Sequence, residues 1–164
     1  MIMKGKIIKY GDNINTDVII PARHCITLDY NELASHCMED LDASFIHKVQ
    51  NGDVIVAGEN FGCGSSREMA PIAIKASGIS CVIAKSFARI FFRNAINIGL
   101  CVIECNKVVR DAKEGDEIEV QFDEGKIIIN NKNYGFKKSD GIISSIIKSG
   151  GLMNFSKEKM IDNK

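Results

Sequence analysis

Apolar runs and amphipathic stretches alternate regularly through the middle of the chain. The runs at residues 53–58, 80–85 and 100–105 are continuous enough to predict strands that are covered on both faces. One helix ending near residue 77 and another over residues 86–99 are predicted between them. Strands that alternate with helices in this way pair in parallel through right-handed crossovers. The pattern therefore predicts an α/β fold with parallel strands and flanking helices.

The regions on either side of this core also carry recognisable patterns. A first strand is expected over residues 5–11, and helical spacing within residues 30–50 predicts one or two short helices. Two alternating runs, 116–122 and 126–131, flank the turn "DEG" and predict a β-hairpin.

The ends of the predicted helices are marked by residues that commonly start or stop them. Gly78 is placed to end the first central helix, while Ser86 can cap the second and Gly99 can end it. A last amphipathic helix is expected over residues 140–151, followed from about residue 155 by a polar tail that we expect to be frayed. The whole chain, 1–164, is predicted to be a single domain.

Composition narrows the class of protein. Lys and Arg together number 21, as do Asp and Glu, so the zero net charge gives no electrostatic signal for nucleic acid or an acidic membrane. The N-terminus shows no signal-peptide pattern, and no apolar run approaches the roughly 20 residues of a membrane span. We therefore expect a cytoplasmic protein that binds neither nucleic acid nor membrane.

The cysteines and histidines do not predict a metal site. None of the six cysteines forms a CxxC pair, and without an export signal we expect reduced, mostly buried thiols. Cys63 differs, because it lies in a glycine-rich segment and is expected to be exposed. The three histidines, His24, His36 and His47, show no metal-ligand spacing, so no bound metal is predicted.

The segment "GENFGCGSSREMAP", residues 58–71, is the strongest candidate for chemistry. It follows a predicted strand and precedes a helix, which is where open α/β sheets bind ligands. Its glycines are expected to let the backbone approach a ligand closely, and a helix N-terminus favours an anion. Ser65 and Ser66 add hydroxyl donors, and Arg67 adds a planar fork that matches a carboxylate. Arg23, in the polar loop after Pro21, is a second candidate for anion contact.

A purely structural role for the same residues remains open at this point. Ser65 and Glu68 have the spacing of a capping box, which would need no ligand. However, Pro71 would lie awkwardly in the first turns of such a helix, so the regular helix is expected to begin later than Ser65. In that case both serines would lie on an irregular turn and be available to a ligand.

Three motifs in order carry a family resemblance: "GDNINTDVIIPAR", "FGCGSSREMAP" and "AKSFARIFFRNAINIGL". Together they resemble the small subunits of 3-isopropylmalate dehydratase, which are the detached swivel domain of the aconitase superfamily. The resemblance runs from about residue 4 to residue 154. It implies the swivelling β/β/α domain of the aconitase C-terminal type, in agreement with the alternation of strands and helices.

The resemblance also implies an activity and a division of labour between two chains. The expected reaction is a hydro-lyase isomerisation of 2-isopropylmalate and 3-isopropylmalate in leucine biosynthesis. A [4Fe–4S] cluster is expected on a separate large subunit and none on this chain, in a heterodimer or heterotetramer. By similarity, Ser65 is the base, Ser66 and Arg67 contact the substrate carboxylate, and Asp17 lies near the active site.

Two positions bear on how far the family's chemistry carries over to this chain. The family usually has His where this chain has Met69, so no proton transfer is assigned there. Ile26 stands in the loop that tunes substrate choice in related proteins, and its apolar side chain favours an alkyl group such as isopropyl. The alternatives are a related hydro-lyase subunit, of homoaconitase or 2,3-dimethylmalate dehydratase, or a non-catalytic binding module with the same fold.

Overall fold

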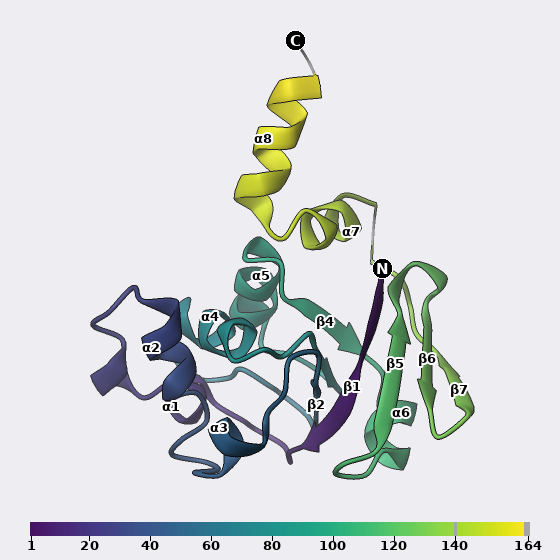
Figure 1. Ribbon diagram of the computed structural model, residues 1–164, viewed down its shortest axis with the longest axis horizontal. Helices are drawn as coiled ribbons and strands as arrows, with labels where there is room; N and C mark the ends of the chain where they lie inside the picture. The colour runs from purple at the N-terminus through teal and green to yellow at the C-terminus, as the bar shows by residue number, and fades with distance from the viewer. Residues whose placement is uncertain (140, 163–164) are drawn as a thin grey trace.

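A computed structural model describes residues 1–139 and 141–162 of the chain. Its centre is a seven-stranded mixed sheet of order β4-β3-β2-β1-β5-β6-β7 (Figure 1). The parallel half consists of β1 (Ile2–Lys9), β2 (Val54–Ala57), β3 (Cys81–Ala84) and β4 (Cys101–Glu104). The antiparallel half consists of β5 (Glu117–Gln121), β6 (Lys126–Ile129) and β7 (Lys132–Gly135). The predicted α/β fold with parallel strands and flanking helices is confirmed.

Strand β1 joins the two halves because its two ends pair differently. Residues 2–6 pair antiparallel with β5, and residues 7–9 pair parallel with β2. Strands β2 and β3 are wholly buried, which explains their unbroken apolar sequences. The hairpin strands β5 and β6 alternate between more and less buried positions, as expected for a sheet face that meets solvent.

The helices lie on the faces and at one end of the sheet (Figure 1). The N-terminal half contains α1 (Thr16–Ile19), the 3-10 turn η1 (Ala22–His24), α2 (Tyr30–Ser35), α3 (Phe45–Lys48) and α4 (Met69–Ala76). The C-terminal half contains α5 (Arg89–Asn97), α6 (Asn106–Asp111), η2 (Phe122–Glu124), α7 (Gly141–Lys148) and α8 (Leu152–Asp162). Helices α2, α4 and α5 lie near one another, whereas α8 extends away from the body of the molecule (Figure 1).

Several sequence-based boundaries need correction. Helix α5 begins at Arg89, and Ser86 does not cap it but accepts a hydrogen bond from the Asn60 N–H at 2.8 Å. The tail predicted to fray forms α8 as far as Asp162, and residues 163–164 lie outside the described part. Strand β7 and helix α6 were not predicted, because their short polar sequences carry little periodicity.

None of the helices within the described residues is both long enough and apolar enough to cross a membrane.

Candidate functional site

The candidate site forms where two loops leave neighbouring parallel strands. The N-terminal loop (residues 10–17, which include the start of α1) follows β1, and the glycine-rich loop (residues 58–68) follows β2. Because the carboxyl ends of parallel neighbours lie at the same edge of the sheet, the two loops emerge side by side. The sequence prediction that the glycine-rich segment lies at this edge is therefore confirmed.

Backbone hydrogen bonds tie the two loops together. The Gly62 N–H donates to the carbonyl of Ile14 at 2.7 Å, and the Thr16 N–H donates to the carbonyl of Cys63 at 2.8 Å. Bonds of this kind fix the main-chain position of the glycine-rich loop independently of its side chains.

The glycines serve close packing within the chain. A Cβ atom on Gly62 (φ +78°) would lie 2.1 Å from Cγ of Phe91, and one on Gly64 (φ +94°) would lie 3.4 Å from the Thr16 hydroxyl oxygen. The left-handed backbone at both positions also favours glycine. We expected these glycines to open space for a ligand. In the structure, the space beside them is occupied by Phe91 and by the N-terminal loop.

Helix α4 begins at Met69, after the serines, as Pro71 suggested. Its N-cap position is Glu68, and no side chain caps the helix, so the capping box of Ser65 and Glu68 does not form. Pro71 is tolerated because it is the third helical residue, whose N–H would have no partner within the helix. Ser65 and Ser66 are therefore exposed on an irregular turn.

The hydroxyl of Ser65 lies against Thr16, which sequence reasoning missed. Thr16 Oγ1 donates to the Ser65 carbonyl at 2.9 Å and lies 3.2 Å from Ser65 Oγ. Since a hydroxyl has one proton, Thr16 can then only accept from Ser65 Oγ, which orients the Ser65 hydroxyl. Thr16 is 1% exposed, so this contact is held from inside the protein.

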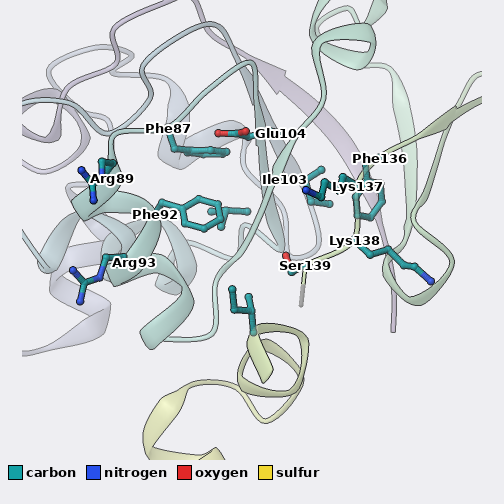
Figure 2. Close-up of a pocket in the computed structure, with 12 residues that line it drawn as sticks. Phe87, Arg89, Phe92, Arg93, Ile103, Glu104, Phe136, Lys137, Lys138 and Ser139 are labelled. Atoms are coloured by element: carbon teal, nitrogen blue, oxygen red, sulfur yellow. The ribbon is translucent and has the colours of Figure 1, made fainter. Parts of the chain in front are cut away.

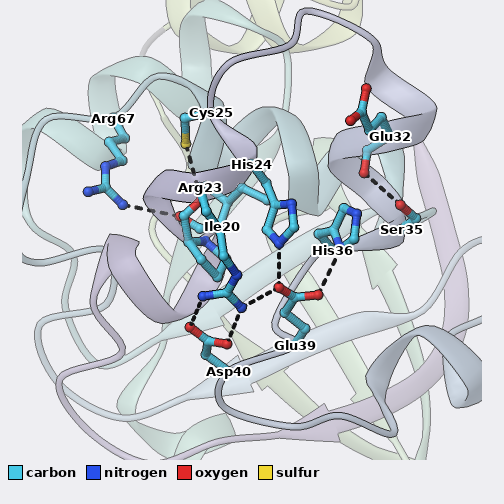
Figure 3. Close-up of polar contacts among 11 residues, drawn as sticks. Ile20, Arg23, His24, Cys25, Glu32, Ser35, His36, Glu39, Asp40 and Arg67 are labelled. Carbon is cyan, nitrogen blue, oxygen red and sulfur yellow. Dashed lines mark hydrogen bonds and ion pairs between the residues drawn. The ribbon is translucent and has the colours of Figure 1, made fainter.

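Arg67 pairs with Asp17, the residue that the resemblance placed near the site. Its Nη1 lies 2.5 Å from Asp17 Oδ1. The same nitrogen donates to the carbonyl of Ile20 at 3.2 Å (Figure 3). Both contacts use Nη1, so Nε and Nη2 have no partner among the described residues. One edge of the guanidinium fork therefore stays available for a carboxylate.

Arg23 is already occupied by protein carboxylates. Its guanidinium lies 3.0 and 2.6 Å from the two oxygens of Asp40 and 2.5 Å from Glu39 (Figure 3). Partial burial would raise the pKa of Glu39, but hydrogen bonds from His36, His24 and Arg23 lower it. The hydrogen bond with Arg23 also lowers the pKa of Asp40. Contact between Arg23 and a substrate stays a prediction, and it would require Arg23 to exchange these partners.

Ile26 is placed as expected for a side chain that meets something outside this chain. It is 90% exposed, and its neighbour Leu28 is 78% exposed. Cys25, which precedes Ile26, turns back so that its thiol faces the carbonyl of Pro21 at 3.6 Å. The segment is thus anchored at its start while its apolar residues face outward.

The signal for Thr16 was present in the "NTD" motif, although only Asp17 was singled out. Asn15 caps α1 by accepting from the Val18 N–H at 3.1 Å, Thr16 contacts Ser65, and Asp17 contacts Arg67. Each residue of the motif thus has its own structural task.

The cysteines do not offer a cluster site in the described residues. Four of the six are buried (Cys37, Cys81, Cys101 and Cys105). Cys63 is only partly exposed, less than we expected. The sole group of three or more His, Cys, Asp or Glu side chains there that could share an ion is His24, His36 and Glu39. The thiolate donors that an iron–sulfur cluster requires therefore do not converge in this part of the chain.

A cavity of about 590 Å³ lies elsewhere, beside α5 and β4 (Figure 2). Phe87, Phe92 and Phe136 contribute aromatic surface, and Arg89 and Arg93 lie at its rim. None of Ser65, Ser66 and Arg67 lines this cavity. The three candidate side chains of the glycine-rich loop therefore do not form part of this cavity.

Comparisons with known proteins give matches to a family model and to individual relatives. A family model of the aconitase C-terminal domain matches residues 5–108. The 3-isopropylmalate dehydratase small subunit of Caldanaerobacter subterraneus is 61% identical over 160 residues, covering 96% of this chain and 99% of that protein. The small subunit of the same name from Ruminiclostridium cellulolyticum is 57% identical over 159 residues, covering 96% of this chain and 98% of that protein.

Two solved structures also resemble this chain. The crystal structure of 3-isopropylmalate dehydratase from Methanocaldococcus jannaschii gives a TM-score of 0.94 at 51% identity, covering 99% of this chain and 98% of that one. Aconitase X from Thermococcus kodakaraensis gives a TM-score of 0.53 at 16% identity, covering 79% of this chain and 90% of that one. The second likeness concerns the fold alone.

Proposed function

The chain belongs to the small subunits of 3-isopropylmalate dehydratase, with the aconitase C-terminal fold, and from this premise we propose that its two paired loops supply the base and the carboxylate contacts of the reaction. Members of this family are hydro-lyase subunits that act together with a large subunit. The alternatives of a homoaconitase or dimethylmalate dehydratase subunit, or of a non-catalytic module, are not favoured by these relatives.

The observation that carries the proposal is the placement of Ser65. Its hydroxyl is exposed at the carboxyl edge of the sheet, yet it is oriented from behind by buried Thr16. In the proposed reaction, Ser65 Oγ takes the proton from a carbon next to a substrate carboxylate while the hydroxyl on the neighbouring carbon leaves as water, which forms a carbon–carbon double bond. Water then adds back with the two positions exchanged, and the proton goes to the carbon that first carried the hydroxyl. A free serine hydroxyl is too weakly acidic for this role, so its anion needs nearby donors and positive charge.

Arg67 and Ser66 are proposed to bind the substrate carboxylate. The Nε and Nη2 edge of Arg67 matches a carboxylate bidentately, while Asp17 holds Nη1 and fixes the plane of the fork. The Ser66 hydroxyl is exposed and makes no hydrogen bond within the described residues, so it is available as a donor. The N-terminus of α4, two residues further on, adds favourable potential for an anion.

The large subunit is proposed to carry the [4Fe–4S] cluster and to complete the site. Ser65 and Ser66 are exposed and Arg67 is half-buried, so a second protein surface is needed to exclude water from a bound acid. The cluster, when bound there, supplies Lewis-acid chemistry at the substrate hydroxyl. We propose a heterodimer or heterotetramer in the cytoplasm, a location in keeping with six free cysteines.

Ile26 is proposed to select the alkyl end of the substrate. A buried isopropyl group gains from contact with an exposed apolar side chain, whereas a carboxylate in the same place would lose water without gaining a partner. This arrangement favours isopropylmalate over substrates with a longer acidic arm.

The deciding experiment is the Ser65→Ala variant, assayed with the large subunit present. Removing a general base typically costs about 10²–10⁴-fold in kcat. Association with the large subunit should be unchanged, because the exposed hydroxyl contributes little to packing. Ser77→Ala is the matched control, since its hydroxyl donates to the Ile74 carbonyl at the far end of α4, away from the two loops. A Ser65→Ala enzyme with most of its rate would remove the serine base from the proposal.

A further inference from the structure

Two histidines and a glutamate converge beside the specificity segment. His24 closes η1, His36 follows the last residue of α2, and Glu39 lies three residues further along. His24 Nε2 lies 2.6 Å from one oxygen of Glu39, and His36 Nδ1 lies 2.7 Å from the other. Figure 3 shows both rings directed at the same carboxylate. The two rings are stacked, with centroids 3.6 Å apart and planes 7° apart.

The backbone that presents Glu39 is itself held in an uncommon conformation. Met38 has φ +62°, which is rare for a bulky residue and strains the backbone. The Met38 side chain is fully buried, and its N–H donates to the carbonyl of Ile19 at 2.8 Å. The core therefore compensates for this strain and fixes the point from which Glu39 projects.

We propose that His24, His36 and Glu39 form a binding site for a divalent transition-metal ion of the zinc class. Two imidazole nitrogens and one carboxylate oxygen are a donor set that suits such ions, with water in the fourth position. The ligand atoms all lie within 4.8 Å of one another. A tetrahedral ion at about 2.0–2.1 Å from each donor needs them about 3.3 Å apart, which tilting the stacked rings about their side-chain bonds can supply.

The charges around the cluster accommodate a cation despite the presence of Arg23. Asp40 engages both terminal nitrogens of Arg23, so the guanidinium keeps a full partner when Glu39 turns toward a metal. With neutral imidazoles, one positive and two negative side chains give the group a net charge of −1.

Such an ion would join the two ends of the segment that carries Ile26. His24 lies on one side of residues 25–35 and His36 on the other, so coordination closes this stretch into a ring. The proposed site is separate from Ser65 and Arg67, and it concerns the segment that we assign to substrate selection. It can therefore be tested without any activity measurement.

The test uses the full chain after treatment with a chelator. Calorimetric titration with Zn²⁺ should show one site per chain, and Co²⁺ should give visible bands of a tetrahedral nitrogen and oxygen site. His24→Ala and His36→Ala should each weaken binding by at least about tenfold, on the scale seen for perturbed metal sites. His47→Ala is the matched control, because His47 is exposed on α3 and outside the cluster.

Two further measurements keep the result clear. Cys25→Ser should leave Co²⁺ binding unchanged, whereas a thiolate-to-cobalt charge-transfer band would assign the metal to cysteine and overturn the proposal. Amide hydrogen exchange over residues 24–36 should slow on addition of Zn²⁺ in the wild-type chain and in His47→Ala, but not in His24→Ala. Failure of the wild-type chain to bind one equivalent, or binding as tight as wild type by either His24→Ala or His36→Ala, would also overturn it. Thermal melts in chelator confirm that each variant is folded.

Discussion

The glycine-rich loop and the segment around Ile26 are both assigned to the substrate, but they are held in different ways. The first is fixed mainly by backbone hydrogen bonds to the N-terminal loop and by the buried Thr16. The second depends on exposed or half-buried side-chain charges of Arg23, Glu39 and Asp40. Backbone bonds inside a core resist sequence change and salt, whereas exposed ion pairs contribute little and are easily replaced.

This difference suits the division of tasks in the proposed reaction. A base must be held within a fraction of an ångström of the reacting carbon, so it is positioned by the sheet and its loops. A selecting side chain can vary between related enzymes without disturbing the base, because its segment touches the core less. The four predictions below test this contrast, from the largest expected effect to the smallest.

In the glycine-rich loop, Arg67→Lys should lower kcat/KM more than any variant other than Ser65→Ala. Lysine keeps the charge but loses the fork, and a hydrogen bond to a charged group is worth roughly 1.5–3 kcal/mol. We expect kcat/KM to fall roughly 10- to 150-fold, with the large subunit held constant. Arg93→Lys, on the exposed rim of the cavity in Figure 2, is the control and should be silent. Equal kinetics for both variants would mean that Arg67 serves only Asp17.

Ile26→Arg tests the specificity segment. A cation there should pair with an acidic arm and no longer bury an isopropyl group, so preference should move toward homoaconitate-like acids. The change in the ratio of kcat/KM values should correspond to about 1–3 kcal/mol, or roughly 5- to 150-fold. Ile142→Arg is the control, because Ile142 is exposed on α7, away from the segment. An unmoved ratio would exclude Ile26 from contact with substrate.

Thr16→Val tests whether Thr16 positions the Ser65 hydroxyl or only fills space beneath the glycine-rich loop. Valine fills nearly the same volume but cannot orient the Ser65 hydroxyl, and a neutral hydrogen bond contributes about 0.5–1.5 kcal/mol. We expect kcat to fall about 2- to 10-fold while KM stays nearly constant. Thr16→Ser, which keeps the hydroxyl, should restore most of the rate. If the serine variant is as slow as the valine variant, the lost methyl packing is responsible.

Asp42→Asn tests a second set of partly exposed charges, three residues beyond Glu39, through its sensitivity to acid. Partial burial would raise the pKa of Asp42, but hydrogen bonds from Lys48, Ser44 and Tyr10 lower it to about 2. A carboxyl with a lowered pKa stabilises the fold above its unfolded pKa of about 4, and this contribution disappears as the pH falls toward 2.

The variant should therefore lose on the order of 1 kcal/mol at neutral pH and show a flatter pH dependence between about 4 and 2. Chemical denaturation of wild type and variant at several pH values measures the free energy of unfolding and its pH dependence. Asp29→Asn, at the N-cap of α2, is a comparison whose loss should reflect capping alone. Parallel pH profiles for wild type and Asp42→Asn would contradict the assignment.

Much of the fold and part of the site could be predicted from local pattern. Continuous apolar runs identified β2, β3 and β4, because a strand buried on both faces has no room for polar residues. The position of the glycine-rich loop between a strand and a helix placed Ser65 and Arg67 at the carboxyl edge of the sheet. Pro71 correctly delayed the start of α4, because the cost of proline within a helix is local.

Other features depended on segments that are distant along the chain and meet only in the folded sheet. The pairing of β1 with β2 brings Asp17 to Arg67 and Thr16 to Ser65, and no local pattern encodes either contact. The same is true of His24 beside His36, whose separation matches no common ligand spacing. Propensity and periodicity act over a few neighbouring residues, so they determined the elements. The partners of each polar side chain were decided by the order in which the strands pair and by the packing that this order imposes.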